Sequence, residues 1–411
     1  MTTVFSGNFT QQEPIPEAAI ERAIAVMRSG RLHRYNTASG ETAETALLEC
    51  EFRDYIGSRY CLAVTSGGYA LTTALRACGI GAGALVLTNG FTLSPVPGAI
   101  AAAGGCTVLV EINEDLQIDL DDLQRKITGS AARALLLSHM RGHIADMDAV
   151  TAICREHRVV LIEDCAHTMG AAWNGTKSGR HGHVACYSTQ TFKHMNSGEG
   201  GLLVSDDPAI VARATVLSGS YMLYGRHPAG PPAETYADIR LDTPNCSGRM
   251  DNLRAAVLRP QLAMLDARCA RWNERYRALA SELAGAPGIS LPRRPPAEQF
   301  VASSIQFRLP EFDAARMRRF LGHCLARGVE LKWFGAGEPT AYTSTHHSWR
   351  YVAAQALPQT DRVLATLCDM RLPLTFSIED CRLIGTIIRE SAVAAAHEAA
   401  APPPAELREV S

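Results

Sequence analysis

The sequence lacks both a long apolar run and an excess of charge of one sign. Its formal net charge of −2 at pH 7 excludes the concentrated basic surface that nucleic acids and anionic membranes require. The most apolar stretches, residues 131–137 and 159–162, are too short to cross a bilayer. Segment 1–16 has no basic stretch followed by an apolar run, so we expect no secretory signal peptide. These absences predict a cytoplasmic protein with neither a nucleic-acid nor a membrane partner.

The twelve cysteines are scattered singly, and the C-x-x-C pairs typical of zinc and redox sites are missing. Several stand among apolar neighbours, such as Cys78, Cys186 and Cys368. We therefore expect reduced cysteines that pack as small hydrophobic residues. The adjacent His346 and His347 are not a metal signature either, because neighbours on an extended segment point to opposite faces. The sequence predicts no metal site.

The first half of the chain alternates between amphipathic helices and short apolar strands. The predicted strands cover residues 60–65, 85–88, 107–111, 134–138, 159–163 and 202–204. The predicted helices cover residues 16–29, 41–56, 69–78, 97–103, 120–126 and 147–157. Strands separated by helices pair in parallel through crossover connections, which predicts an α/β sheet with helices on both faces. Ligands bind such sheets at the carboxyl ends of the strands.

The pattern changes after about residue 219. Segment 220–244, rich in Pro, Gly and Tyr, is too long for a mere connector, so we predict a functional or interface loop. Residues 250–284 predict one or two long helices, and segments 303–309, 314–327 and 378–395 indicate a smaller α+β part. The length of 411 residues also favours two domains. We predict an N-terminal arm (1–15), a large domain (16–260), a small domain (261–397) and a disordered tail (398–411).

Lys193 stands in a context unlike that of an ordinary surface lysine. Phe192 precedes it, a Gly-Glu-Gly-Gly turn at residues 198–201 follows it, and the apolar strand 202–204 comes next. This arrangement predicts a loop that enters the interior of the sheet domain. A lysine in a restricted site near other cationic groups has a depressed pKa and can form an imine with a carbonyl cofactor. Without this context, a solvated surface lysine is the simpler interpretation.

A second motif, Asp164 with His167, comes at the end of the predicted strand 159–163. One interpretation is an acidic helix N-cap after a strand. In the other, Asp164 pairs with the protonated ring nitrogen of pyridoxal phosphate (PLP), whose pyridinium form is the better electron sink. His167 then contacts the ring oxygen or braces Asp164.

A third motif, Ser66, Gly67 and Gly68, lies at a strand-to-helix junction. Free backbone N–H groups and the helix dipole make such a junction a natural phosphate site, although these turns occur throughout α/β folds. Combined with Ser188 and with the pair Asp164 and Lys193, the turn describes a complete PLP pocket. It comprises a phosphate cradle, a pyridinium partner and an imine lysine.

The order of these motifs resembles the DegT/StrS family of PLP-dependent sugar aminotransferases. The similarity runs from about Pro14 to Arg389. Its strongest matches are GHIADM at 142–147, EDCAHTMG at 163–170, TFK at 191–193 and GEGG at 198–201. The resemblance implies PLP-dependent transferase fold type I, the aspartate-aminotransferase fold. That fold has a large, mainly parallel-sheet domain and a smaller C-terminal α+β domain.

The resemblance also implies roles for the motif residues. Lys193 matches the Schiff-base lysine, Asp164 the partner of the pyridine nitrogen and His167 the residue that contacts the ring. Ser188 and the turn at 66–68 match phosphate-binding positions. The family further implies the cofactor pyridoxal 5'-phosphate and an amino donor such as glutamate or glutamine.

Asn245 matches an asparagine that the partner subunit lends to the phosphate, which implies a homodimer with shared active sites. The spacing from Asn245 to Arg249 is longer than the family pattern. Where the family stacks an aromatic residue on the ring, this chain has Leu93, and Phe91 two residues earlier is expected to serve instead. Met140 and Arg141 replace a common Leu-Tyr pair. These departures are expected to line the substrate side.

These features predict an aminotransferase in which the freed Lys193 moves a proton as general base and acid. The acceptor stays open among a nucleotide-linked keto-sugar, a cyclitol ketone and a smaller keto acid. Two alternatives are a dehydratase-type PLP reaction, although the related dehydratases usually have histidine at the lysine position, and a non-catalytic PLP-fold regulator that senses a ligand. The candidates for a residue that binds a substrate anion are Arg141, Arg249, Lys332 and Arg350.

Overall fold

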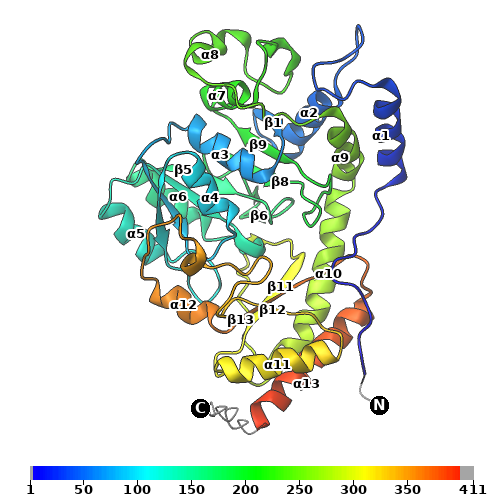
Figure 1. Cartoon of the computed structure of the whole chain (residues 1–411), viewed down its shortest axis with the longest axis vertical. Coiled ribbons are helices and arrows are strands. Elements are labelled where there is room, and N and C mark those ends of the chain that lie inside the picture. The colour runs from blue at the N-terminus through cyan, green and yellow to red at the C-terminus, as the bar shows by residue number, and fades with distance from the viewer. Residues whose placement is uncertain (1–2, 399–411) are drawn as a thin grey trace, which may run out of the picture.

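The computed structural model describes residues 3–398 and is built around a seven-stranded sheet (Figure 1). The strands, in the order β1-β9-β8-β5-β4-β2-β3, are β1 (Tyr60–Val64), β2 (Leu85–Asn89), β3 (Cys106–Val110), β4 (Ala134–Ser138), β5 (Val160–Asp164), β8 (Val184–Ser188) and β9 (Gly201–Ser205). Strands β3, β2, β4, β5 and β8 pair in parallel. The sequence predicts the first four of these strands but not β8, and the predicted strand 60–65, which is β1, pairs antiparallel rather than parallel. Strand β9 is antiparallel to both of its neighbours. Segment 189–200, which joins it to β8, contains no crossover helix.

Helices cover both faces of this sheet because its strands are apolar on both faces. In β4, Leu135 belongs to the cluster that contains Phe52, whereas Leu136 belongs to the cluster that contains Leu75. The helices of this half are α1 (Glu17–Ser29), α2 (Glu44–Ile56), α3 (Gly67–Ala77), α4 (Pro95–Ala102), α5 (Leu120–Thr128), α6 (Met147–Glu156) and α7 (Pro208–Ser218). The alternation along the strand thus builds two cores, one on each face.

Local chemistry sets the helix boundaries. Helix α1 ends at Gly30 with a left-handed φ of 69°, as predicted. Helix α3 begins at Gly67 rather than at residue 69, because the Ser66 side chain accepts a hydrogen bond from the Tyr69 N–H at 3.1 Å. Helix α4 begins at Pro95 rather than at residue 97, since proline is favourable in the first helical turn.

A second, three-stranded sheet lies below the large one in Figure 1. It is antiparallel, in the order β11 (Ser304–Arg308), β13 (Leu367–Arg371) and β12 (Lys332–Trp333). Helices α10 (Leu265–Leu283), α11 (Ala314–Ala326) and α13 (Ile378–His397) share a hydrophobic core with this sheet. Helix α9 (Asn252–Ala263) packs against α1 and α2 instead, and Thr360 of α12 (Pro358–Leu364) hydrogen-bonds to Glu111 of the large half. Phe5 and Phe9 of the N-terminal arm pack edge-on against Phe376. The domain boundary near residue 260 stays a prediction, and the predicted tail beyond residue 398 lies outside the described residues.

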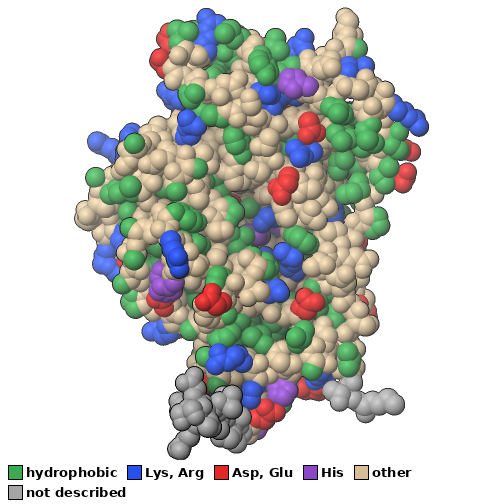
Figure 2. Space-filling model, viewed as in Figure 1, with side chains coloured by type: hydrophobic (Ala, Val, Ile, Leu, Met, Phe, Trp, Pro, Cys, Tyr) green, Lys and Arg blue, Asp and Glu red, His purple; other side chains and the backbone are tan. Residues whose placement is uncertain are grey.

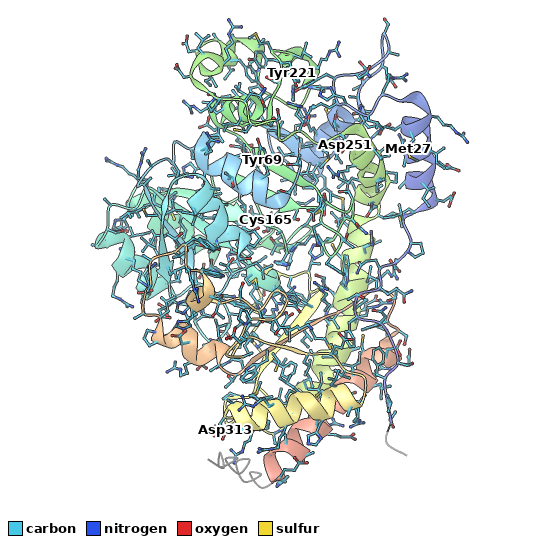
Figure 3. All side chains as sticks on the ribbon, in the orientation of Figure 1. Met27, Tyr69, Cys165, Tyr221, Asp251 and Asp313 are labelled. Carbon is cyan, nitrogen blue, oxygen red and sulfur yellow. The ribbon has the colours of Figure 1, made fainter. Side chains whose placement is uncertain are left out.

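Segment 220–244 is more ordered than the predicted loop. It contains two 3₁₀ turns, Tyr224–Arg226 and Ala233–Tyr236, and the short helix α8 (Ile239–Asp242). Tyr236 is fully buried, and its ring stacks on that of Tyr224 at 3.8 Å. Tyr221, labelled in Figure 3, is 59% exposed. Aromatic stacking therefore fixes the interior of this segment and leaves Tyr221 at the surface.

The structure agrees with the prediction of free cysteines but not with the geometry expected for His346 and His347. The twelve cysteines are free thiols, and eight of them are buried as predicted, whereas Cys106 and Cys246 are exposed. The expectation that the rings of His346 and His347 point to opposite faces is wrong, because the two residues lie in a 3₁₀ turn rather than an extended segment, and both rings point to Asp361. Each Nε2 is 2.8 Å from the same carboxylate oxygen. Between residues 3 and 398, no helix combines the length and apolarity that crossing a membrane would take.

Candidate active site

The carboxyl ends of β4, β5 and β8 border a cavity of about 460 Å³. Figure 2 shows Lys, Arg and His side chains at a hollow near the centre of the viewed face, between the two sheets. Of the nine residues predicted to bind or react with the cofactor, seven line this cavity: Ser66, Gly67, Gly68, Asp164, His167, Ser188 and Lys193. Leu93, Met140 and Arg141, expected to line the substrate side, line it too. The fold therefore brings together side chains that lie far apart in the chain.

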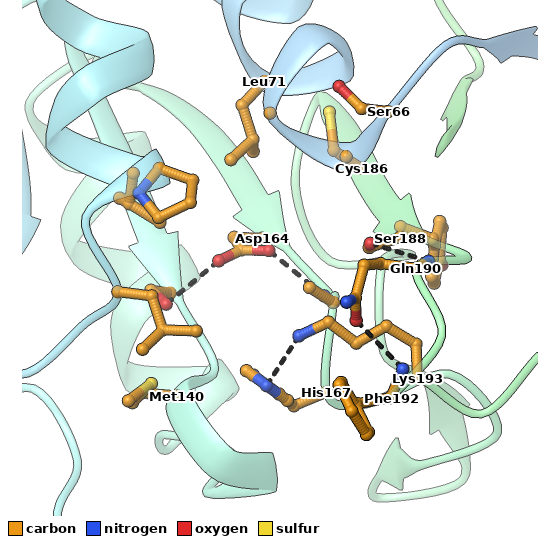
Figure 4. A pocket seen from close by; sticks show the side chains of 18 of the residues that line it. Ser66, Leu71, Met140, Asp164, His167, Cys186, Ser188, Gln190, Phe192 and Lys193 are labelled. Atoms are coloured by element: carbon orange, nitrogen blue, oxygen red, sulfur yellow. Dashed lines mark hydrogen bonds between the residues drawn. The ribbon is translucent and has the colours of Figure 1, made fainter. Parts of the chain in front are cut away.

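Lys193 projects into the cavity from the loop between β8 and β9 (Figure 4). Its Nζ lies 2.8 Å from Nε2 of His167. Burial, and then the positive charge of Arg141, lower the pKa of Lys193 to about 7. The structure thus supplies an amine that is largely uncharged just above neutral pH.

His167 is buried, and burial together with the nearby Lys193 holds its pKa well below the usual range. The imidazole is therefore neutral at pH 7. Its Nε2 is placed to accept a hydrogen bond from the Lys193 amine. His167 in this way orients the amine without adding a charge.

Asp164 ends strand β5, and its carboxylate faces the same cavity (Figure 4). It accepts a hydrogen bond from the Ser138 hydroxyl at 3.0 Å and another from the Ala166 N–H at 3.1 Å. Burial raises the pKa of Asp164 from its ordinary value. A buried carboxylate held at two oxygens is a rigid partner for a positively charged ring.

Ser66, Gly67 and Ser188 form a small concave wall at the N-terminus of α3. A Cβ added at Gly67 would lie 2.8 Å from Cβ of Ser188, so only glycine leaves the two elements this close. In this narrow space the helix N-terminus and two serines provide N–H and O–H donors without an accompanying cation. The wall has the chemistry of an anion site.

Two predicted positions lie elsewhere. Phe91 is 1% exposed and packs edge-on against Phe334 at 5.1 Å, outside the cavity, whereas Leu93 lines it. The expectation that Phe91 covers the site is therefore wrong, because Phe91 fills a hydrophobic cluster instead. Asn245 is exposed and accepts a hydrogen bond from the Ser247 N–H at 2.9 Å, away from the cavity of its own chain.

Three cavity residues carry weak or no sequence signals. Arg141 stood among several arginine candidates, marked only by its departure from a common Leu-Tyr pair. Arg371 and Tyr342 come from the smaller half of the chain and have no motif. Their place at the site depends on how β13 and segment 334–345 pack against the large sheet, which no local pattern encodes.

Comparison with known proteins agrees with this geometry. The model of the DegT/DnrJ/EryC1/StrS aminotransferase family matches residues 15–389. The dTDP-3-amino-3,4,6-trideoxy-alpha-D-glucose transaminase of Streptomyces venezuelae is 34% identical over 69% of this chain and 70% of the relative. The L-glutamine:2-deoxy-scyllo-inosose aminotransferase of Streptomyces fradiae is 30% identical over 72% of this chain and 70% of the relative.

A solved structure extends the similarity to the whole fold. The crystal structure of Streptomyces venezuelae DesV in complex with a ketimine intermediate has a TM-score of 0.75 at 28% identity, and the match covers 91% of this chain and 94% of that one. The match supports the predicted fold type I, with its mainly parallel sheet. The motifs, the fold and the relatives agree: the chain belongs to the DegT/DnrJ/EryC1/StrS aminotransferase family.

Proposed function

We propose that this aminotransferase carries pyridoxal 5'-phosphate on Lys193 and moves an amino group from an amino acid to a ketone. The observation that carries the proposal is the convergence of Lys193, Asp164 and the concave wall of Ser66, Gly67 and Ser188 on one cavity. An amine with a pKa near 7, a buried carboxylate and an anion site match the carbonyl, ring nitrogen and phosphate of PLP.

Each residue has a distinct task in this proposal. When bound, PLP supplies a pyridinium ring that accepts electrons from the bond broken at the substrate carbon. Lys193 holds and moves a proton at its Nζ, and His167 orients that amine. Asp164, fixed by Ser138, keeps a positive charge favourable at the ring nitrogen. Leu93, rather than Phe91, lies against the cofactor.

The relatives support a choice of substrate class. Their names include a transaminase of a dTDP-linked amino sugar and aminotransferases that use L-glutamine and an inosose. Glutamine or glutamate is accordingly the proposed donor, and a ketone of sugar or cyclitol size the proposed acceptor. A cavity of about 460 Å³, within the range of small-molecule pockets, fits the cofactor and such a ring.

We further propose a homodimer in which Asn245 completes the phosphate site of the partner. Asn245 is exposed and lies outside the cavity of its own chain, as a residue offered to a second subunit must. Its side chain lies close to Gly219, where an added Cβ would be 2.6 Å from the Asn245 Oδ1.

Attachment of the cofactor tests the proposal. Added PLP is expected to give a visible absorbance band, and mass spectrometry after borohydride reduction should find the cofactor on Lys193. Lys193→Ala should show neither, whereas Lys126→Ala on α5, a lysine paired with Asp122, should match the wild type. A wild-type protein that stays colourless with PLP, or cofactor fixed on another lysine, would contradict the proposal.

A further inference from the structure

Two guanidinium groups share the cavity with Lys193, and the proposed function assigns no ligand to either of them. Arg141 lies in the turn after β4, and Arg371 is the last residue of β13. The Tyr342 ring lies near both, with its centroid 4.3 Å from Cζ of Arg141 and 5.2 Å from Cζ of Arg371. The large and small sheets thus each bring one arginine to the same place.

The two arginines lie at the end of the cavity away from the proposed phosphate site. Together with Lys193 they line a second, small cavity that extends toward Phe9 and Trp272. Neither Ser66 nor Ser188 borders that cavity. The positive groups are therefore available to a substrate rather than to the cofactor phosphate.

Carboxylates of the protein balance the positive charges of Arg141 and Arg371 only in part. Arg141 is 7% exposed, and one Nη donates to Oδ2 of Asp369 at 2.8 Å, while its buried Nε has no hydrogen-bond partner in the described part of the chain. Asp369 is already occupied, because it also accepts hydrogen bonds from Gln306 and Tyr342.

Arg371 is left without a counter-ion of its own. Its guanidinium stacks on Phe192 at 3.7 Å and forms no ion pair within residues 3–398. Burial lowers its pKa, which reflects the cost of holding that charge away from water. A half-buried, stacked guanidinium next to the reacting amine is the usual protein partner of a carboxylate.

We propose that Arg141 and Arg371 form an anion subsite for a carboxylate of the acceptor, so that the acceptor is a carboxylate-bearing ketone. This inference rests on the proposed function and narrows its substrate class away from neutral sugars and cyclitols. The amino-acid donor also has a carboxylate, so the two half-reactions must be measured separately to show which substrate the arginines bind.

The backbone at Arg141 adds to the argument. Arg141 has φ 56° and ψ 21°, a left-handed conformation that is uncommon for a residue with a side chain. Such conformations cost free energy and cluster where a side chain must be aimed at a ligand. Here the turn directs the guanidinium into the cavity, beside Lys193.

Binding of an inert dicarboxylate is the first test. Succinate, titrated into the PLP-loaded protein by calorimetry, is expected to bind, and uncharged succinamide to bind at least about tenfold more weakly. Arg371→Gln should weaken succinate binding about tenfold or more without removing the cofactor band. Arg382→Gln, an exposed arginine on α13, is the matched control. Equal binding of succinate and succinamide would overturn the subsite.

The acceptor half-reaction decides which substrate uses the subsite. Protein in the pyridoxamine-phosphate form is mixed with oxocyclohexanecarboxylate, with its carboxamide and with scyllo-inosose, and the return of the visible band is followed. We expect the carboxylate to exceed the other two in kcat/KM by about tenfold or more, and Arg371→Gln to abolish this preference. Faster reaction of the neutral ketones, or a loss in Arg371→Gln confined to the donor half-reaction, would overturn the proposal.

Failure of the subsite and failure of the proposed function give different results. If the wild-type protein binds no PLP, the proposed function itself is wrong. If PLP binds on Lys193 and an amino acid converts it to the pyridoxamine form, the function stands, and equal use of charged and neutral ketones rejects the anion subsite alone.

Discussion

At the residue scale, the reactivity of Lys193 depends on its surroundings. Burial and the positive charge of Arg141 lower its pKa from 10.5 to about 7, and Asp164 opposes this shift. Because only the uncharged amine attacks a carbonyl, the fraction of reactive Lys193 increases as the pH rises through about 7. An ordinary lysine would reach the same fraction only near pH 10.

We therefore predict that PLP attaches to the apoprotein at a rate that rises with pH and levels off above a midpoint near 7. Stopped-flow absorbance of the visible band measures this rate. Arg141→Met removes the second-largest cause of the shift, so its midpoint should move to higher pH. A wild-type midpoint close to that of an ordinary lysine would show that the cavity does not lower the lysine pKa.

Asp164 is expected to act on the chemistry more than on binding. Asp164→Asn keeps the size and most hydrogen bonds but removes the charge that faces the ring nitrogen. Loss of one such electrostatic contact costs about 10²–10³ in kcat, so a drop of this size is expected while the cofactor band remains. Ser138→Ala, which removes only the hydroxyl that positions Asp164, should have a smaller effect. An unchanged kcat in Asp164→Asn would refute the assigned role.

At the element scale, the antiparallel hairpin of β8 and β9 explains where Lys193 lies. The hairpin loop begins at the carboxyl end of β8 and returns to β9 at the same edge of the sheet. A helical crossover would have carried the chain to the opposite edge. The loop therefore places Lys193 in the same cavity as Asp164, which is the last residue of the neighbouring strand β5.

The contact between α3 and β8 gives a prediction for adjacent glycines. A Cβ at Gly67 would lie 2.8 Å from Cβ of Ser188, whereas at Gly68 its nearest neighbour is Cβ of Pro95 at 3.9 Å. Gly67→Ala should displace α3 from Ser188 and weaken PLP binding by about tenfold or more. Gly68→Ala should have a much smaller effect on the PLP dissociation constant, measured by fluorescence titration. Equal effects would show that this wall does not hold the phosphate.

At the scale of the whole molecule, the two sheets create the cavity between them. Ser66, Asp164 and Lys193 come from the large sheet and its loops, whereas Tyr342 and Arg371 come from the smaller half. The proposed homodimer adds a third contributor, because Asn245 does not line the cavity of its own chain.

Mixed dimers test this sharing. In a dimer of one Lys193→Ala chain and one Asn245→Ala chain, shared sites would give one fully mutated site and one intact site. We expect the mixed dimer to recover about half of the wild-type activity at limiting PLP, while each variant alone stays well below that level. Activity measured after mixing and re-association checks this. No recovery in verified mixed dimers would show that Asn245 acts within its own chain or not at all.

By itself, the sequence determined the fold type and predicted most of the side chains that meet at the cavity. Asp164 and the turn at Ser66 each end or follow a predicted apolar strand, and strands that run in the same direction bring such ends to one edge of the sheet. Local sequence was therefore sufficient to place them together. Ser188 is assigned by the family resemblance, because no strand is predicted before it. Local sequence also predicted the end of the first helix at Gly30, because a residue without Cβ adopts a positive φ easily.

Only the tertiary structure decided which side chains complete the cavity. Phe91 and Leu93 are equally eligible by spacing, but packing against Phe334 buries Phe91 and leaves Leu93 at the cavity. Arg141 and Arg371 meet because β13 packs near the turn after β4, a contact between distant segments that no local periodicity records. Periodicity reports which face of an element is buried, whereas the packing of remote elements determines what that face meets.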